Sequence, residues 1–434
     1  MAETFDVILK GGTLVNHDGI VIDCTGLHIL PGVIDSQVHF REPGLDHKED
    51  LETGSRAAVL GGVTSVFEMP NTNPLTTDEA KLADKVKRGT NRMHCDFAFW
   101  VGGTRDNAKD VAELERLPGA AGIKVFMGSS TGDLLVEDDD GVASILRNTN
   151  RRAAFHSEDE FRLRERENLR VEDDPSSHPI WRDEIAALQC TQRLVSIARK
   201  ERARIHVLHI STAEEIPFLA ANKDVASCEA TPHHLTLTAD DYARLGTLIQ
   251  MNPPVREARH KAGIWEGIDQ GIIDVLGSDH APHLLEEKAK PYPASPSGMT
   301  GVQTLLPIML DHVNAGRLTL ERLVDLASHG PQRLFGIAKK GRVAVGWDAD
   351  FAIVDLKRKE TITNAQAGSK AGWTPYDGKQ VTGWCVRHNH SRQPHYVGRR
   401  NCETEPRSNG QISRDFKIDF AIGVARDLES VSKR

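Results

Sequence analysis

The chain has 434 residues with a formal net charge of −8, and 39% of its residues are hydrophobic, which suits a globular protein of about two or three domains. The acidic balance argues against a nucleic-acid or anionic-membrane partner, and no apolar run reaches the roughly 18 residues of a membrane span. The acidic N-terminus does not resemble a signal peptide and the six cysteines include no CxxC pair, so we expect a cytoplasmic protein without a disulfide framework.

Two flanking segments differ from the long middle of the chain. Residues 5–30 and 341–356 alternate apolar and polar positions between Gly-rich turns, a pattern typical of antiparallel strands. The two segments lie on either side of the middle in sequence. We therefore expect residues 1–30 and 341–384 to pair into one small discontinuous β domain, a β-sandwich that looks shortened.

Between these flanks, residues 31–340 alternate short apolar runs with charged, amphipathic segments. Eight runs read as strands: 33–39, 63–69, 95–101, 122–127, 152–156, 204–209, 226–230 and 272–279. The segments between them carry apolar residues at helical spacing. Eight β–α units predict an α/β fold, the TIM (β/α)8 barrel. A doubly wound open sheet is the alternative, but the first β–α turn lacks its GxGxxG fingerprint.

Five of the predicted strands carry a residue that can bind a metal ion: His39, Lys124, His156, His209 and Asp279. Active sites of parallel barrels lie at the C-terminal edge of the strands. A single histidine there could simply pack in the core, but the recurrence favours a metal site, because imidazoles and carboxylates suit zinc. A carboxylate beside a metal-bound water, such as Asp279, can also carry a proton.

Lys124 lies in an otherwise apolar strand, GIKVF. A buried lysine is costly when charged, so it either reaches an acidic partner or becomes neutral. A neutral amine can react with CO2 to form a carbamate, whose oxygens can bridge two metal ions. The residue alone leaves both interpretations open.

Other polar residues lie beside the strand ends. Arg41 leaves the strand on the same side as His39, which suits a clamp for a substrate carboxylate, with a surface ion pair as the alternative. Three further candidates lie in loops that follow strands: Asn71, Asn252 and His283. His206 is expected to pack, because it points away from His209 on a strand. The role of the doublet His233–His234 stays open.

Six segments, in this order, resemble those of the dihydroorotases within the amidohydrolase superfamily: REPG, EMPNTNP, GIKVFMGSSTG, HISTAEE, MNPPVR and SDHAPH. The resemblance covers about residues 5–380. It implies a zinc-dependent cyclic amidase with a binuclear centre, which interconverts N-carbamoyl-L-aspartate and dihydroorotate in pyrimidine synthesis.

The resemblance also implies roles for single residues. It implies metal ligands at five positions: His39, Lys124, His156, His209 and Asp279. It implies substrate contacts at four positions: Arg41, Asn71, Asn252 and His283. Lys124 would be carboxylated and would bridge two zinc ions, and Asp279 would be the catalytic residue that moves the proton.

Three features depart from the family pattern. The family motif D-x-H-x-H appears here with Gln37 in place of its first histidine, so one metal position would be weak or empty. The N-terminal flank looks shortened before the barrel. Residues 385–434 are rich in Arg, His and Asn without periodicity, so we expect an aberrant, disordered tail. A frameshift near Cys385 would account for it.

Two other functions stay open. One is another cyclic amidase, such as allantoinase or dihydropyrimidinase, although Arg41 and Asn71 favour a substrate that bears a carboxylate. The other is a silent dihydroorotase-like subunit that supports aspartate transcarbamoylase, which Gln37 favours and the retained ligands oppose. For the enzyme we expect a small-molecule substrate, and a homodimer or aspartate transcarbamoylase as the protein partner.

Overall fold

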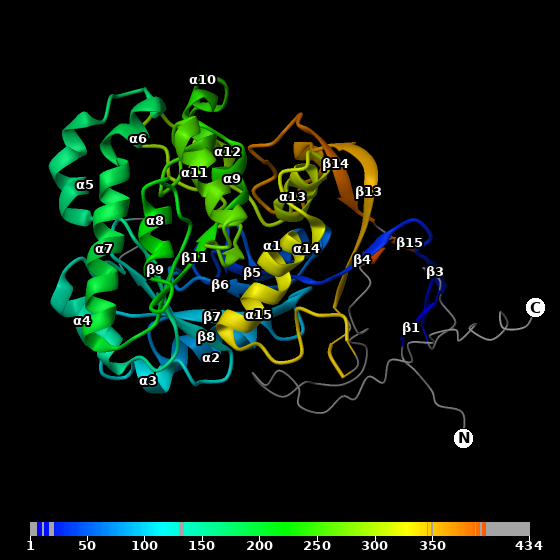
Figure 1. Ribbon diagram of the computed structural model, residues 1–434, viewed down its shortest axis with the longest axis horizontal. Helices are drawn as coiled ribbons and strands as arrows, with labels where there is room; N and C mark the ends of the chain where they lie inside the picture. Colours follow the sequence, from blue (N-terminus) through cyan, green and yellow to red (C-terminus); the bar gives the residue numbers. More distant parts are fainter. Residues whose placement is uncertain are drawn as a thin grey trace, which may run out of the picture.

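The computed structural model describes residues 7–10, 13–16, 21–129, 134–344, 346–348, 350–386, 388–390 and 393–395. Eight parallel strands form the centre of the molecule (Figure 1): β5 (Val33–Val38), β6 (Val63–Glu68), β7 (Asp96–Gly102), β8 (Ala120–Phe126), β9 (Ala153–His156), β10 (Ile205–Val207), β11 (Ala226–Ala230) and β12 (Val275–Leu276). Each strand pairs with the next one in the chain, and a parallel bridge from Val38 to His280 joins the last strand to the first. The predicted barrel is confirmed.

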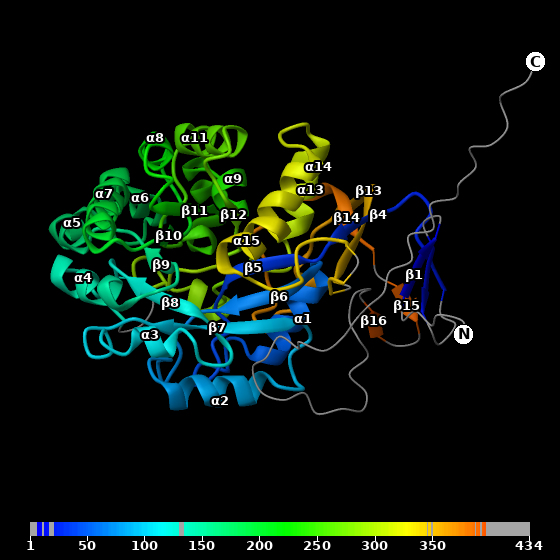
Figure 2. The same cartoon turned by 60° about the horizontal axis from the view of Figure 1, so that its bottom comes forward.

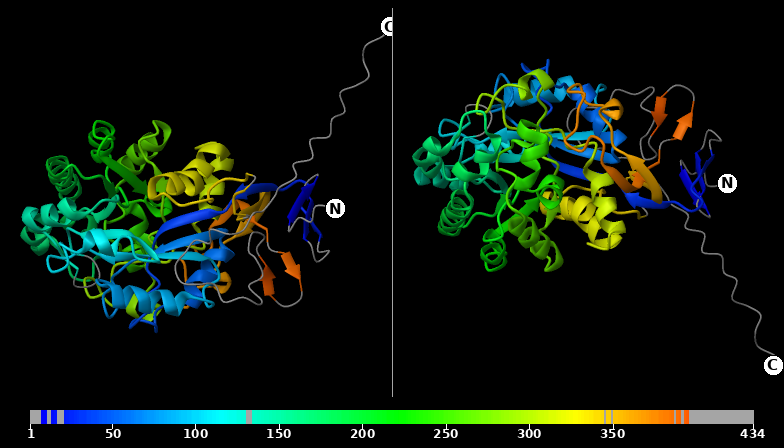
Figure 3. Two further views of the ribbon diagram at one scale, coloured as in Figure 1. Left: turned by 90° about the horizontal axis from the view of Figure 1, so that it is seen from below. Right: turned by 90° about the horizontal axis from the view of Figure 1, so that it is seen from above.

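Helices surround the strands, as Figures 2 and 3 show from three further directions. They are α1 (Leu51–Leu60), α2 (Glu79–Gly89), α3 (Val111–Leu114), α4 (Asp139–Asn148), α5 (Glu160–Arg166), α6 (His178–Trp181), α7 (Glu184–Glu201), α8 (Glu215–Ala220), α9 (Pro232–Thr236), α10 (Tyr242–Leu245), α11 (Ala258–Asp269), α12 (Leu285–Lys288), α13 (Leu305–Asn314), α14 (Leu320–Val324) and α15 (Gly330–Phe335). Several begin after an aspartate whose side chain accepts a backbone N–H of the first turn, as Asp50 does for α1 and Asp183 for α7.

Two apolar clusters hold the barrel together. The larger one lies between strands and helices and includes Val66, Phe99 and Leu194. The smaller one lies inside the barrel, where Trp100 packs edge-on against Phe335 with ring centroids 5.6 Å apart. At the C-terminal ends of the strands the buried side chains are polar instead, among them Gln37, His156 and Asp279.

A second sheet joins the two flanks of the chain beside the barrel. β4 (His28–Pro31) and β14 (Gln380–Cys385) pair antiparallel with the two edges of β13 (Phe351–Thr361). The predicted pairing of the flanks thus occurs at β4 and β13. Three earlier strands, β1 (Val7–Lys10), β2 (Thr13–Asn16) and β3 (Val21–Asp23), form an antiparallel sheet of their own. The domain boundaries at residues 31 and 340 stay a prediction.

The structure describes only the start of the tail that was expected to be disordered. β14 ends at Cys385, and the short strands β15 (His388–His390) and β16 (Gln393–His395) pair antiparallel. Residues 396–434 lie outside the described residues. Within the described ranges, no helix combines the length and apolar character needed to cross a membrane.

Candidate active site

A cavity lies at the C-terminal ends of the barrel strands. Six of the predicted site residues line it: His39, Arg41, His156, His209, Asn252 and Asp279. Three others lie one contact behind this wall. Asn71 bonds to His39, His283 contacts Arg41, and the Lys124 ammonium lies 4.1 Å from the ring centroid of Phe126, which lines the cavity. The strand ends therefore converge as the barrel predicts.

His156 and His209 face each other across this cavity. Nδ1 of His156 lies 3.1 Å from Nε2 of His209, and Nε2 of His156 lies 2.9 Å from a carboxylate oxygen of Glu158. Because a carboxylate accepts, Nε2 carries the proton and Nδ1 presents its lone pair to the partner ring. Two nitrogens bound to one tetrahedral zinc at about 2.1 Å lie roughly 3.3 Å apart. Burial lowers the pKa of both rings, so they are neutral, as metal binding requires.

His39 and Asp279 form a second facing pair. The side-chain oxygen of Asn71 lies 2.7 Å from Nδ1 of His39, so this nitrogen carries the proton. The free lone pair on Nε2 then faces Oδ1 of Asp279 at 3.2 Å. Two acceptors at this distance repel each other unless a cation lies between them. The donor set therefore fits a metal ion here too.

Gln37 occupies the place of the missing histidine. Its side-chain nitrogen donates to Oδ1 of Asp279 at 3.0 Å, and its side-chain oxygen is buried without a hydrogen-bond partner among the described residues. Gln37 lines the cavity. The substitution is thus part of the site and not a change in the surrounding packing.

Lys124 has no acidic partner within ion-pair distance in the described part of the chain. It is 1% exposed, its ammonium donates only to the carbonyl of Val125 at 3.3 Å, and burial lowers its pKa well below the ordinary value. Of the two interpretations of this lysine, the neutral amine fits these contacts. No three described His, Cys, Asp or Glu side chains form a ready metal cage, so each facing pair needs a further ligand.

Arg41 is a buried cation on the cavity wall. It is 1% exposed, and its Nε donates to the carbonyl of Pro282 at 3.1 Å. Burial lowers its pKa to about 10, which leaves it charged near neutral pH. Among the described residues no carboxylate lies within ion-pair distance of it. A buried guanidinium without a protein counter-ion is suited to an anionic ligand.

Three residues of the site have backbone conformations that non-glycine residues rarely adopt. Arg41, His209 and Asp279 have φ angles of 66°, 39° and 45°. Each lies just beyond the end of a strand, where the chain turns away from the barrel. Strain of this kind gathers at functional sites, because it is retained only where the surrounding structure enforces it.

Known proteins share both the sequence and this architecture. A Dihydro-orotase-like family model matches residues 26–113, and an amidohydrolase family model matches residues 189–379. A dihydroorotase of Methanosarcina mazei is 37% identical over 381 residues, which cover 84% of this chain and 83% of that protein. The chain belongs to the dihydroorotase family of amidohydrolases. It is accordingly a cyclic amide hydrolase.

Hydantoinases are also similar to this family member. An L-hydantoinase of Paenarthrobacter aurescens is 31% identical over 426 residues, 87% of this chain and 92% of that protein. The solved structure of the L-hydantoinase (dihydropyrimidinase) from Arthrobacter aurescens superposes with a TM-score of 0.81 at 29% identity. It covers 88% of this chain and 90% of that one.

The sequence did not reveal the residues that orient the metal-binding and substrate-binding side chains of this dihydroorotase-family site. Glu158 holds Nε2 of His156 and accepts from Nε of Arg182 at 3.2 Å. His178 donates from Nε2 to the side-chain oxygen of Asn252 at 2.9 Å. The spacing of Glu158, two residues after His156, was the one available signal, because such residues lie on one side of an extended chain.

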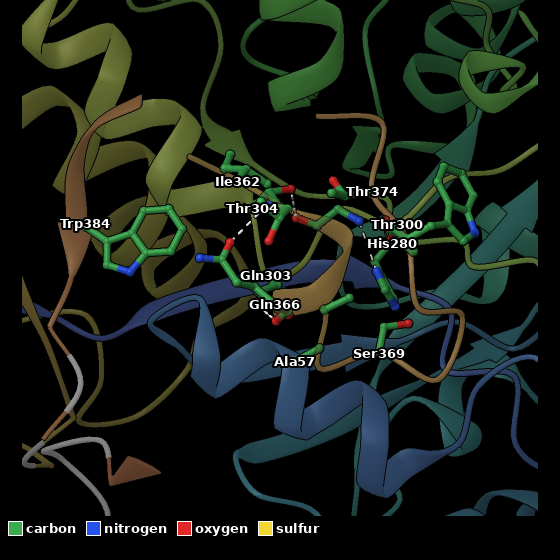
Figure 4. Close-up of a pocket in the computed structure, with 14 residues that line it drawn as sticks. Ala57, His280, Thr300, Gln303, Thr304, Ile362, Gln366, Ser369, Thr374 and Trp384 are labelled. Carbon is green, nitrogen blue, oxygen red and sulfur yellow. Dashed lines mark hydrogen bonds between the residues drawn. The ribbon is translucent and has the colours of Figure 1, made fainter. Parts of the chain in front are cut away.

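A second cavity (Figure 4) lies between the barrel and a strap formed by residues 362–376. His280, next to Asp279, lies on its wall. The side chain of Gln303 spans it, donating to the carbonyl of Gln366 at 2.8 Å and accepting from the backbone N–H of Gly368 at 2.7 Å. Since this amide bonds to the protein, we interpret the space as a packing gap that ties the strap to the barrel.

Proposed function

We propose that this chain interconverts dihydroorotate and N-carbamoyl-L-aspartate, the reaction that closes the ring in pyrimidine synthesis. The observation that carries the proposal is Arg41, a buried cation on the cavity wall without an acidic partner among the described residues. Both molecules carry a carboxylate that takes no part in the bond change. A guanidinium clamps such a group through two parallel hydrogen bonds.

The ligands fit two zinc ions. His39 and Asp279 would hold one ion, and His156 with His209 would hold the other. A carboxylated Lys124 would supply the oxygen that each pair lacks. When bound, the metal ions would supply an activated water and polarise the carbonyl of the substrate.

The buried amine of Lys124 supports the carbamate. In the neutral form its nitrogen attacks CO2, a C–N bond forms, and the nitrogen releases one proton. Burial favours the neutral amine needed for that attack. The resulting anion would lie near the ligand nitrogens of His156 and His209.

Asp279 carries the proton in this mechanism. In hydrolysis its carboxylate takes the proton of the attacking water and passes it to the ring nitrogen as the C–N bond breaks. In the synthetic direction the same carboxylate accepts the proton of the carbamoyl nitrogen and passes it to the oxygen that leaves as water. The side-chain N–H of Gln37, 3.0 Å from Oδ1, would help to hold the carboxylate in place.

Hydrolysis of dihydroorotate by the purified protein with added zinc tests the proposal. Hydantoin and dihydrouracil, cyclic amides that lack the carboxylate, are the comparison substrates. We expect dihydroorotate to have the highest kcat/KM of the three. A preference for hydantoin would instead establish the second candidate function, which the 31% identity to an L-hydantoinase favours.

Gln37 would also suit a catalytically silent subunit, an alternative that the membership among cyclic amide hydrolases opposes. Such a subunit would show no turnover of any of the three substrates, and binding to aspartate transcarbamoylase would then be the property to measure. The cytoplasmic location and a homodimeric assembly are likewise proposals. Size measurement in solution, with and without aspartate transcarbamoylase, distinguishes these assemblies.

A further inference from the structure

His283, buried behind Arg41, meets a hydrogen-bonding group at each ring nitrogen. Its Nδ1 lies 3.1 Å from the ammonium of Lys48. Its Nε2 lies 3.1 Å from the carbonyl oxygen of Ser297 and 3.2 Å from the guanidinium of Arg41. The indole N–H of Trp373 donates to the carbonyl of His283 at 2.7 Å and so fixes its backbone.

These contacts determine where the ring proton lies. An ammonium can only donate, so Nδ1 must offer its lone pair to Lys48. A carbonyl can only accept, so Nε2 must carry the proton toward Ser297. The opposite tautomer would offer a lone pair at Nε2 to Arg41, but it would set an N–H against the ammonium and a lone pair against the carbonyl, and both of these contacts would be repulsive. Burial and the nearby Arg41 and Lys48 charges hold the pKa of His283 well below its usual range, so the ring is neutral.

This tautomer places two donors side by side, one on the wall of the cavity, which Arg41 lines, and one directly behind it at His283. The guanidinium of Arg41 and the Nε2–H of His283 lie 3.2 Å apart, and neither can accept from the other. Arg41 and Ser297 both line the cavity. A carboxylate oxygen placed beside Arg41 could accept from both donors at once, which is the arrangement that distinguishes an anion from a neutral amide.

We propose that Lys48 is a positioning residue for substrate recognition: by occupying Nδ1 of His283, it keeps the proton on Nε2, beside Arg41, where the substrate carboxylate can share it with the carbonyl of Ser297. The inference rests on the proposed function, because it assigns the carboxylate of dihydroorotate to this pair of donors. Lys48 itself does not touch the substrate; it acts through His283.

Lys48 is held firmly enough for this role. Its ammonium pairs with Oε1 of Glu287 at 2.9 Å, and its side chain is 13% exposed. The other oxygen of Glu287 accepts the backbone N–H of Leu284 at 3.0 Å, at the start of α12. The helix that follows His283 in the chain therefore anchors the lysine that orients His283.

Nuclear magnetic resonance of the full-length protein, labelled isotopically at histidine nitrogen, tests the tautomer directly. The signals that disappear in His283→Asn identify this ring. We expect the Nε2–H tautomer in the wild type and a mixed or Nδ1–H ring in Lys48→Met. Lys81→Met, which removes a lysine of α2 paired with Asp78, is the control and should leave the signals unchanged. An Nδ1–H ring in the wild type, or no change in Lys48→Met, would overturn the proposal.

Steady-state kinetics then separate this role from a purely structural one. Lys48→Met should raise KM for dihydroorotate by roughly tenfold or more with a smaller change in kcat, because a charge-assisted contact to the carboxylate weakens. Lys48→Arg keeps a donor and should recover most of the loss. Equal losses in both variants, or a loss in kcat alone, count against the proposal. If Lys48→Met does not fold, Glu287→Gln, which releases the anchor of Lys48, should move KM the same way.

The proposed function and the role of Lys48 can each prove wrong without the other. A wild-type protein that does not turn over dihydroorotate contradicts the proposed function. The resonance experiment requires no turnover, and it still decides whether Lys48 sets the tautomer of His283.

Discussion

Oδ1 of Asp279 lies 3.0 Å from the side-chain nitrogen of Gln37 and 3.2 Å from Nε2 of His39. One carboxylate oxygen thus faces a neutral amide donor where the family motif has a histidine. An amide oxygen is a poorer zinc ligand than imidazole. The asymmetry divides the site into a pair of two imidazoles, His156 with His209, and a weaker pair, His39 with Asp279.

The first prediction concerns metal content. The purified protein should hold one zinc ion tightly and one weakly, and activity should rise when zinc is added. Gln37→His should convert the weak position into a tight one, because imidazole replaces the amide on the same strand face. Elemental analysis after dialysis against a chelator measures this. Two tightly bound equivalents in the wild type, unchanged in Gln37→His, would contradict it.

Replacement of Asp279 by asparagine should reduce kcat by about a hundred- to ten-thousandfold, because the proton carrier is lost. Asp84→Asn, on the exposed face of α2, is the matched control and should retain activity. Thermal unfolding of both variants checks that the fold is intact. Nearly normal turnover by Asp279→Asn would refute its assignment.

Arg41→Ala should impair dihydroorotate selectively. Loss of a charge-assisted hydrogen bond costs about 1.5–3 kcal/mol, roughly ten- to a hundredfold in kcat/KM. A cyclic amide without a carboxylate should lose much less. If both substrates lose the same factor, Arg41 supports the structure and does not read the carboxylate.

The buried ion pair of Glu68 and Lys85 gives a prediction of stability. Both side chains are 1% exposed, and the ammonium of Lys85 also donates to the carbonyl of Met69 at 3.0 Å. Lys85→Met leaves the carboxylate buried without its partner, which should lower the free energy of unfolding by about 3–5 kcal/mol.

The double variant Glu68→Leu with Lys85→Met should recover much of that loss, since no buried charge remains. Arg199→Ala, which removes the exposed pair with Asp224, is the control and should be nearly neutral. Urea unfolding compares the three proteins. A Lys85→Met variant as stable as the control would show that the pair contributes little.

The buried carboxyl group of Glu229 should make the stability of the folded protein depend on pH. Burial raises its pKa from 4.5 to about 8, so between these values the folded protein keeps a proton that the unfolded chain releases. Stability should therefore fall as pH rises through that window. Glu229→Gln should make the fall shallower, although Asp35, whose pKa burial raises to about 7, preserves part of it. Unfolding midpoints across this range measure the slope, and equal slopes for the two proteins would disprove the assignment.

The sequence alone could predict the barrel and the convergence of its strand ends, because both follow from local patterns. It could not give strand bounds. The predicted run 272–279 contributes only β12 (Val275–Leu276). After it, the N–H of Ser278 bonds to the side chain of Asp35 and not to the backbone of a neighbouring strand. Likewise the strand expected over 341–356 begins at Phe351, where pairing with β4 starts.

The supporting contacts of the site were beyond the sequence for a different reason. Lys48 and His283 are separated by 235 positions, and nothing local to either residue indicates the other. Gln37 was recognisable as a departure, but its bond to Asp279 depends on how the first and last strands meet. Partners that lie so far apart in the sequence can be recognised only in the folded structure.

The strap of residues 362–376 has a consequence for how this enzyme can be rebuilt. Trp373 holds the backbone of His283, and Ser369 donates to Glu49, the neighbour of Lys48. The barrel thus carries the residues of the site, while the strap holds the backbone of His283 and the neighbour of Lys48 in place from outside the barrel. A chimera that exchanges barrels between relatives would have to include the strap, because the residues that determine substrate specificity depend on contacts from outside the barrel.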